Sequence, residues 1–163
     1  VRVSLFVSGC RHHCKGCFNA ETWDFNFGQA YTEDTEKEII DALAPSYIEG
    51  FSLLGGEPFE PENQPVLAEL LQKIKATYPE KNVWCYSGYH FDSDLQPGGS
   101  VYTEFTDRML EMIDVLVDGE FIEARKDITL RFRGSSNQRI IDVKKSREAQ
   151  QVVLSPLQKK REF

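Results

Sequence analysis

Short apolar runs alternate along the chain with longer segments in which apolar residues recur every three or four positions. The short runs predict buried β-strands, which we place at residues 3–7, 51–54, 83–86 and 115–117. The longer segments predict amphipathic helices at residues 33–43, 65–78 and 104–113. Strands and helices that alternate in this way predict an α/β fold of parallel strands with crossover helices, arranged as an open sheet or an incomplete barrel.

A glycine-containing turn follows each of the four predicted strands. These turns are residues 8–17, 55–58, 87–89 and 118–119. Because ligands bind at the carboxyl ends of parallel strands, we expect the four turns to line one rim of the sheet. The pattern therefore predicts that ligand-binding chemistry gathers at this rim.

Three of the four cysteines, Cys10, Cys14 and Cys17, lie in the first of these turns. Three thiolates at this spacing can hold three corners of an iron–sulfur cluster and leave its fourth iron open to a ligand that is not protein. A structural zinc site is the alternative, with His12 or His13 as the fourth ligand. Disulfides fit less well, since the first apolar run is too short for a secretory signal. We therefore expect a metal centre in a reducing, cytoplasmic compartment.

Gly55, Gly56 and Glu57 are candidate ligand contacts on the same rim. Glycine lets the backbone approach a ligand closely, and a carboxylate accepts hydrogen bonds from an ammonium group. An ordinary tight turn leading into Pro58 would explain the same residues. Their position beside the cysteines favours the functional explanation. Cys85 lies on a predicted strand, where we expect a small buried hydrophobic residue rather than a ligand.

The length and charge of the chain limit the function classes. Its 163 residues suffice for one hydrophobic core, and no apolar stretch approaches the about 20 residues that span a bilayer. The first residue is Val rather than Met, so we expect the natural N-terminus to lie upstream. We find no signature of a membrane partner.

The net charge of −7 is unevenly distributed. Residues 125–163 carry eleven Lys or Arg against four Asp or Glu, so the remainder of the chain is strongly acidic. That acidity argues against nucleic-acid binding. We expect a domain at residues 1–143 and a basic C-terminal tail at residues 144–163, which is either solvated and partly disordered or docks a partner.

The cysteine motif, taken with the LGGEP segment at residues 54–58, resembles the radical S-adenosylmethionine enzymes. Further segments resemble the small activases of this superfamily that act on anaerobic ribonucleoside-triphosphate reductases; they are residues 2–10, 17–19, 22–23, 114–121 (DVLVDGEF) and 133–139 (RGSSNQR). The resemblance covers residues 1 to about 143. It implies the radical S-adenosylmethionine fold, an incomplete TIM-like barrel.

The resemblance also implies the cofactors and their contacts. Cys10, Cys14 and Cys17 would hold a [4Fe-4S] cluster whose open iron binds the amino and carboxylate groups of S-adenosylmethionine. The implied contacts of that cofactor are Gly16, Cys17, Phe18, Gly55, Gly56 and Glu57. Many members carry an aromatic residue where this chain has Gly16, and Phe18 is expected to take over its place near the adenine.

The implied reaction is radical generation. The reduced cluster would donate one electron to the sulfonium, giving methionine and a 5′-deoxyadenosyl radical. That radical would take a hydrogen atom from a glycine of the large catalytic subunit of the reductase and leave a glycyl radical there. The implied partners are this subunit and a low-potential electron donor such as flavodoxin.

Two other functions stay open at this point. One is a different small radical S-adenosylmethionine enzyme that acts on a small molecule, such as one resembling the deazaguanine-forming group. The other is a zinc-binding interaction module.

An activase must admit a peptide loop, so we expect a barrel that is open on one side.

Overall fold

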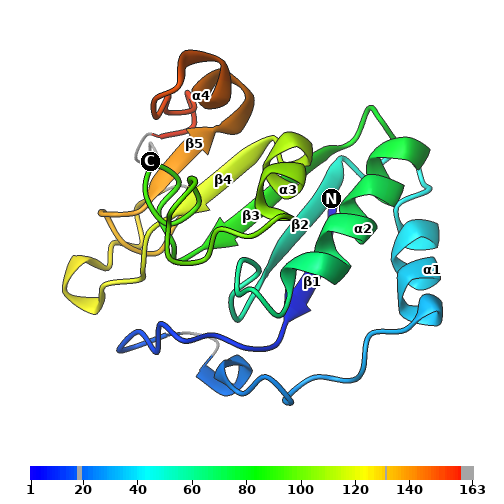
Figure 1. Cartoon of the computed structure of the whole chain (residues 1–163), viewed down its shortest axis with the longest axis horizontal. Helices are drawn as coiled ribbons and strands as arrows, with labels where there is room; N and C mark the ends of the chain where they lie inside the picture. The colour runs from blue at the N-terminus through cyan, green and yellow to red at the C-terminus, as the bar shows by residue number, and fades with distance from the viewer. Residues whose placement is uncertain (18–19, 131, 159–163) are drawn as a thin grey trace.

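A single five-stranded sheet organises the chain (Figure 1). The computed structural model describes residues 1–17, 20–130 and 132–158. The strands follow the order β1-β2-β3-β4-β5 in space as in sequence; they are β1 Arg2–Val7, β2 Gly50–Gly55, β3 Asn82–Ser87, β4 Val115–Asp118 and β5 Arg139–Asp142. The first four strands are parallel, which confirms the predicted α/β fold. The fifth, which the hydrophobic pattern did not predict, runs antiparallel to β4.

The predicted helices are all present, with shifted ends. They are α1 Glu33–Ala42, α2 Gln64–Thr77 and α3 Thr106–Met112. Local signals set where they begin: Thr32 and Thr35 form a reciprocal capping box at the start of α1, and Pro65 stands in the first turn of α2. None of the helices in the described ranges is both long enough and apolar enough to cross a membrane.

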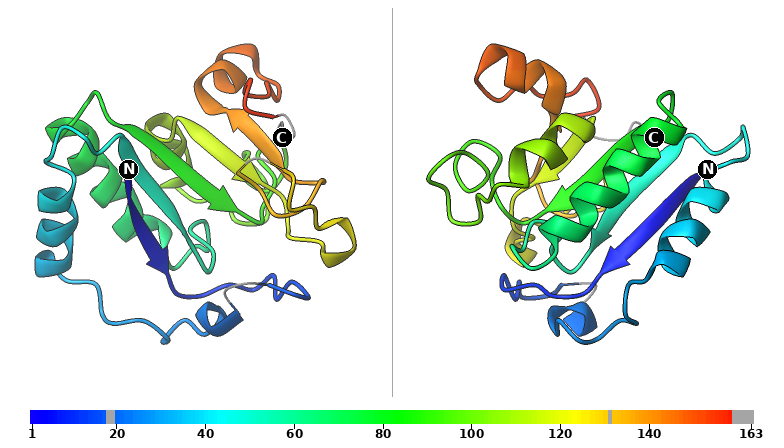
Figure 2. Two further views of the ribbon diagram at one scale, coloured as in Figure 1. Left: turned by 180° about the vertical axis from the view of Figure 1, so that it is seen from behind. Right: turned by 45° about the vertical axis from the view of Figure 1, so that its right-hand side comes forward.

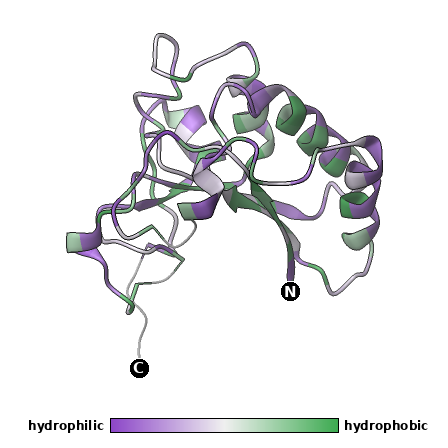
Figure 3. Ribbon diagram, turned by 90° about the horizontal axis from the view of Figure 1, so that it is seen from below, coloured by the Kyte–Doolittle hydropathy of each residue, from purple (hydrophilic) through white to green (hydrophobic). Residues whose placement is uncertain are grey.

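The main core lies between these three helices and one face of the sheet (Figure 2). Phe51 and Leu53 of β2, and Val83 and Cys85 of β3, point to the helices and are fully buried. Hydrophobic residues concentrate in the strands and in the helices packed on them (Figure 3). Cys85 is therefore the buried core residue that its position on a strand predicted.

The opposite face of the sheet is lined by a second apolar row. Because side chains alternate along a strand, the residues next to the core positions point away from the helices. They are Phe6 and Leu54, which are paired across β1 and β2, and Tyr86, Val117 and Ile140, which are paired across β3, β4 and β5. Phe6 on edge strand β1 keeps 55% of its surface exposed. We call this row the open face.

Residues 144–158, within the segment expected as a basic tail, pack against β5. Helix α4 spans Val143–Ala149, and Val143 is fully buried. Ser146 Oγ accepts a hydrogen bond from Val153 N at 2.8 Å, which folds the following chain back. Ser155 N then donates to Ile140 O at 2.8 Å. The sequence signal for α4 is Asp142, whose Oδ1 caps the helix by accepting from Lys145 N at 3.0 Å.

Replacing Asp142 by alanine is expected to lower the free energy of unfolding by about 1 kcal/mol, because the N-terminal turn of α4 loses its side-chain acceptor. Urea denaturation of the apoprotein measures this change. Glu148→Ala, an exposed substitution on the same helix, is the matched control and should stay within about 0.5 kcal/mol of the unsubstituted protein. Equal stabilities of the two variants would contradict the cap.

Candidate functional site

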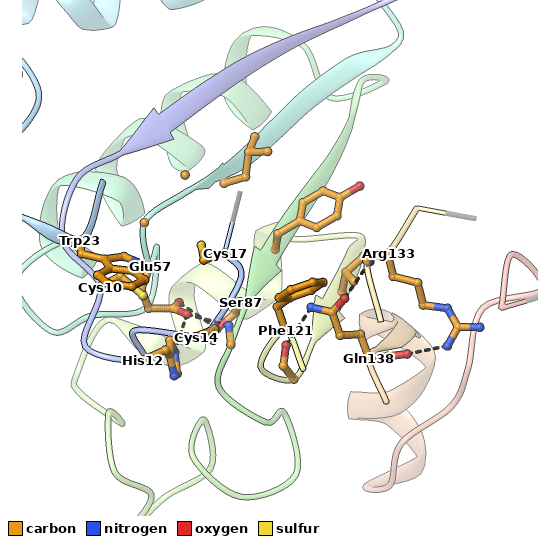
Figure 4. Close-up of a pocket in the computed structure, with 18 of the residues that line it drawn as sticks. Cys10, His12, Cys14, Cys17, Trp23, Glu57, Ser87, Phe121, Arg133 and Gln138 are labelled. Atoms are coloured by element: carbon orange, nitrogen blue, oxygen red, sulfur yellow. Dashed lines mark hydrogen bonds and ion pairs between the residues drawn. The ribbon is translucent and has the colours of Figure 1, made fainter. Parts of the chain in front are cut away.

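A cavity of about 400 Å³ lies at the carboxyl ends of the parallel strands (Figure 4). All four turns that follow these strands contribute to its wall, as the rim prediction required. Leu54, Tyr86 and Val117 of the open face supply apolar wall, and the three cysteines line the cavity as well. The cavity therefore combines thiol ligands with an apolar surface large enough for an organic cofactor.

Cys10 is buried, whereas Cys14 and Cys17 are half-buried. Burial raises the pKa of the Cys10 thiol to about 11, and burial, with Glu120 adding to it, raises the pKa of Cys14. Without metal these two thiols are therefore protonated at neutral pH, and a metal that binds them displaces their protons.

The position of the three cysteines bears on the kind of metal centre that they can hold. Cys10, Cys14 and Cys17 all line this one cavity. In a [4Fe-4S] cluster each cysteine binds a different iron, so three thiols can hold three of its four corners. The donor set fits a cluster with three protein ligands.

Two buried glutamates hold the cysteine loop against the segment after β2. Glu60, fully buried, accepts hydrogen bonds from the backbone N of Arg11 at 3.0 Å and from its guanidinium at 3.2 Å. Glu57 accepts one from His12 Nε2, at 2.9 Å between Nε2 and Oε1. Backbone bonds add to this, since Glu57 N donates to Gly9 O at 2.7 Å. The short acidic segment that contains Glu57 and Glu60 thus holds the cysteine loop in place.

Glu57 is the most heavily bonded side chain of the cavity wall. Glu57 is 1% exposed, and its carboxylate accepts hydrogen bonds from the cysteine loop and from the turn after β3. Besides His12, Gly88 N donates to Oε1 at 2.7 Å, while Ser87 Oγ and Phe59 N each donate to Oε2 at 2.8 Å. Glu57 therefore ties the cysteine loop to the end of β3.

His12 has neither ring nitrogen left for a metal. Nε2 bonds Glu57, and Nδ1 lies 3.2 Å from Glu120 Oε1. Burial lowers the pKa of His12, but the hydrogen bonds to Glu57 and Glu120 outweigh it and the net pKa is raised. The ring also packs on Tyr89, with centroids 4.2 Å apart. Gly88 makes room for it, because a Cβ there would lie 2.6 Å from the imidazole.

The paired glycines serve a purpose that the sequence did not indicate. Gly55 adopts φ +113°, and a Cβ on it would lie 2.5 Å from Val7 N. A Cβ on Gly56 would lie 2.6 Å from Gly9 O. Both glycines line the cavity, yet their closest neighbours are the backbone of β1 and of the cysteine loop. Glycine is therefore required at both positions because other backbone segments of the protein lie too close for a side chain, and not only because a ligand approaches there.

Gly56→Ala is expected to prevent the cysteine loop from seating, so that iron uptake during anaerobic reconstitution falls to about a tenth or less of the unsubstituted protein's. The physical reason is the clash with Gly9 O, which only backbone movement can relieve. Gly98→Ala is a control of the same chemistry in an open loop. Its φ of +85° strains the local backbone, but no atom lies within 4 Å of the new methyl group, so iron uptake should stay normal. Normal iron content with weakened S-adenosylmethionine binding would instead make Gly56 a ligand contact only.

The other predicted contacts of S-adenosylmethionine, Gly16, Cys17 and Phe18, differ in whether they line the cavity. Cys17 lines the cavity. Gly16, at φ +77°, does not contribute to its wall, and a Cβ there would meet the Glu123 side chain at 3.0 Å. Phe18 lies outside the described residues.

Sequence reasoning missed what joins the DVLVDGEF and RGSSNQR segments. They pair through β4 and β5, where fully buried Asp118 receives Arg139 in a bidentate ion pair with N–O distances of 2.9 and 2.6 Å. Gln138 Oε1 accepts from Gly134 N at 2.9 Å, and its Nε2 donates to Gly119 O at 3.0 Å. Opposite charges in both segments were the available signal. Together the two segments build the wall that faces the cysteines (Figure 4).

Comparison with known proteins agrees with this geometry. Residues 1–141 match the family model of a 4Fe-4S single cluster domain. The anaerobic ribonucleoside-triphosphate reductase-activating protein of Enterobacteria phage T4 is 40% identical over 85% of this chain and 82% of its own length. The proteins of the same name from Escherichia coli K12 and Vibrio cholerae are 42% and 41% identical, over 84% of this chain and 85% and 84% of theirs. No solved structure matches. By descent and by its cluster domain, the chain belongs to the anaerobic ribonucleoside-triphosphate reductase-activating proteins.

Proposed function

We propose that this protein cleaves S-adenosylmethionine reductively and uses the 5′-deoxyadenosyl radical to form a glycyl radical on the large catalytic subunit of an anaerobic ribonucleoside-triphosphate reductase. The observation that carries the proposal is the set of three cysteines in the wall of an apolar cavity at the strand ends. The relatives' name supports the partner. The reaction makes the protein a radical S-adenosylmethionine oxidoreductase.

Cys10, Cys14 and Cys17 would hold the [4Fe-4S] cluster. When bound, the cluster supplies a low-potential electron and an open iron for the cofactor's amino and carboxylate groups. The protein's share is to bind, orient and exclude water. Buried Glu57 and Glu60 hold the cysteine loop in one conformation before any ligand arrives, which lowers the entropic cost of binding.

S-adenosylmethionine would lie along the wall formed by Cys17, Gly55, Gly56 and Glu57, with Gly16 and Phe18 as the other proposed contacts. Glu57 already accepts four hydrogen bonds, so an ammonium group reaching Oε1 would have to share it with His12 and Gly88. Leu54, Tyr86 and Val117 offer an apolar surface for the adenosine part.

The open face supports the proposed incomplete barrel. The sheet has β1 and β5 as edges, and its apolar row continues from the cavity to exposed Phe6. A glycine loop of the reductase could reach the cavity over this face, within the proposed catalytic domain of residues 1–143. Basic residues 144–163 are the second proposed contact with the partner. A flavodoxin-like donor in the cytoplasm would supply the electron.

Electron paramagnetic resonance tests the proposal. The anaerobically reconstituted and reduced protein is mixed with S-adenosylmethionine and the large reductase subunit, and a glycyl radical signal is expected. Cleavage of S-adenosylmethionine with no signal on the subunit would indicate a radical enzyme for a small molecule. One tightly bound zinc, with neither iron nor sulfide, would indicate the interaction module.

A further inference from the structure

The indole of Trp23 carries a buried hydrogen-bond donor that nothing described satisfies. Trp23 ends the short 3-10 helix Ala20–Trp23 and lines the cavity. Its Nε1 is buried and has no acceptor among residues 1–17, 20–130 and 132–158. A buried N–H without a partner costs free energy, so native proteins place one where a ligand or water supplies the acceptor.

The indole is held in place rather than mobile. His13 stacks on it, with ring centroids 4.5 Å apart and planes inclined by 7°. The backbone is fixed as well, since Cys10 N donates to Trp23 O at 3.2 Å and Gly9 N donates to Thr22 O at 2.7 Å. The donor is therefore preorganised at a defined position in the cavity wall.

Trp23 lies at the cysteine end of the cavity, beside Cys10 and away from Arg133 and Gln138 (Figure 4). The buried carboxylate in this wall, Glu57, already accepts four hydrogen bonds. The described part of the wall therefore offers the indole no acceptor, whereas a group that occupies the cavity next to Cys10 can supply one. Sulfur atoms of a cluster bound there are anionic and accept hydrogen bonds.

We infer that Trp23 is a positioning residue for the iron–sulfur cluster, donating an N–H···S hydrogen bond from Nε1 to a cluster sulfur next to Cys10. The inference rests on the proposed cluster ligands. Reduction adds negative charge to the cluster, and a hydrogen-bond donor stabilises that charge. Trp23 therefore raises the reduction potential of the cluster and makes it easier for a physiological donor to reduce.

The test is a potentiometric titration of the reconstituted full chain, with the midpoint potential as the readout. Trp23→Phe keeps an aromatic ring for His13 to stack on and removes the N–H, so its midpoint is expected to shift to a more negative value. Trp84→Phe is the matched control, because Trp84 does not itself line the cavity and packs against Arg2 and behind Phe132, which does. Its midpoint should equal that of the unsubstituted protein.

A purely structural role would move the midpoint in the other direction. A smaller ring that merely admits water would stabilise the reduced cluster and make the potential less negative. Replacing Trp23 by β-(3-benzothienyl)alanine, which keeps the indole's shape with sulfur in place of N–H, should reproduce the negative shift without that side effect. This variant also decides the case in which Trp23→Phe fails to assemble a cluster.

Four outcomes would overturn the inference. They are an unchanged midpoint in both Trp23 variants, a less negative one, loss of the cluster in both, and an unchanged midpoint with weaker S-adenosylmethionine binding, which would make the cofactor the acceptor. A cluster that assembles normally in all of these proteins keeps the proposed function intact. An unsubstituted protein that takes up no iron would instead overturn the proposed function, and this inference with it.

Discussion

Replacing Cys14 by alanine is expected to abolish the glycyl radical signal of the reductase subunit. Three cysteines line the cavity and can each bind one of the four irons of the cluster. With only two cysteines left, two irons would have no protein ligand. Iron and sulfide bound after reconstitution should fall with the signal. Both quantities are measured on the same sample, by metal analysis and by electron paramagnetic resonance.

The chain contains its own control for this substitution. Cys85→Ala makes the same chemical change at a fully buried core position of β3 that faces the helices rather than the cavity. It should cost about 0.5–3 kcal/mol of stability, as core substitutions usually do, and leave iron content and radical yield intact. A Cys14→Ala protein that keeps both cluster and signal would remove Cys14 from the ligand set.

The hydrophobic pattern predicted best those elements whose buried residues recur at regular intervals within one short segment. The expected helix at residues 65–78 forms as Gln64–Thr77, because its apolar residues repeat on one face and Pro65 marks its start. Strand β5 is different. Ile140 and Ile141 are both fully buried although they point to opposite faces, and two adjacent apolar residues form no period that indicates a strand.

The candidate site likewise has features that the sequence predicts and contacts that only the folded structure reveals. That the cysteines lie on one rim with the other three turns could be predicted, because the parallel-strand rule depends only on topology. The partners of Glu57 could not, since His12 and Ser87 lie 45 and 30 positions away and only folding brings them together. The sequence marked Glu57 as an acceptor for an ammonium group. The structure adds that its present donors all come from the protein.

Glu57→Gln is expected to destabilise the apoprotein by about 3 kcal/mol and to loosen the cysteine loop. The reason is the direction of the hydrogen bonds. Gly88 N donates to one carboxylate oxygen and Phe59 N to the other. A glutamine amide would turn its NH₂ toward one of these backbone N–H groups in either orientation, and a backbone N–H cannot become an acceptor. Urea denaturation measures the stability, and iron uptake measures the loop.

Glu62→Gln separates this effect from a general loss of negative charge. Glu62 pairs with Arg11 on the same acidic segment, but its side chain is 48% exposed, so its substitution should change the free energy of unfolding by less than about 1 kcal/mol. If both variants were equally stable, Glu57 would not be the tie between the cysteine loop and β3. If Glu57→Gln kept its stability and its iron but lost S-adenosylmethionine binding, the carboxylate would act on the cofactor alone, and the hydrogen bonds from His12 and Ser87 would serve only to orient it.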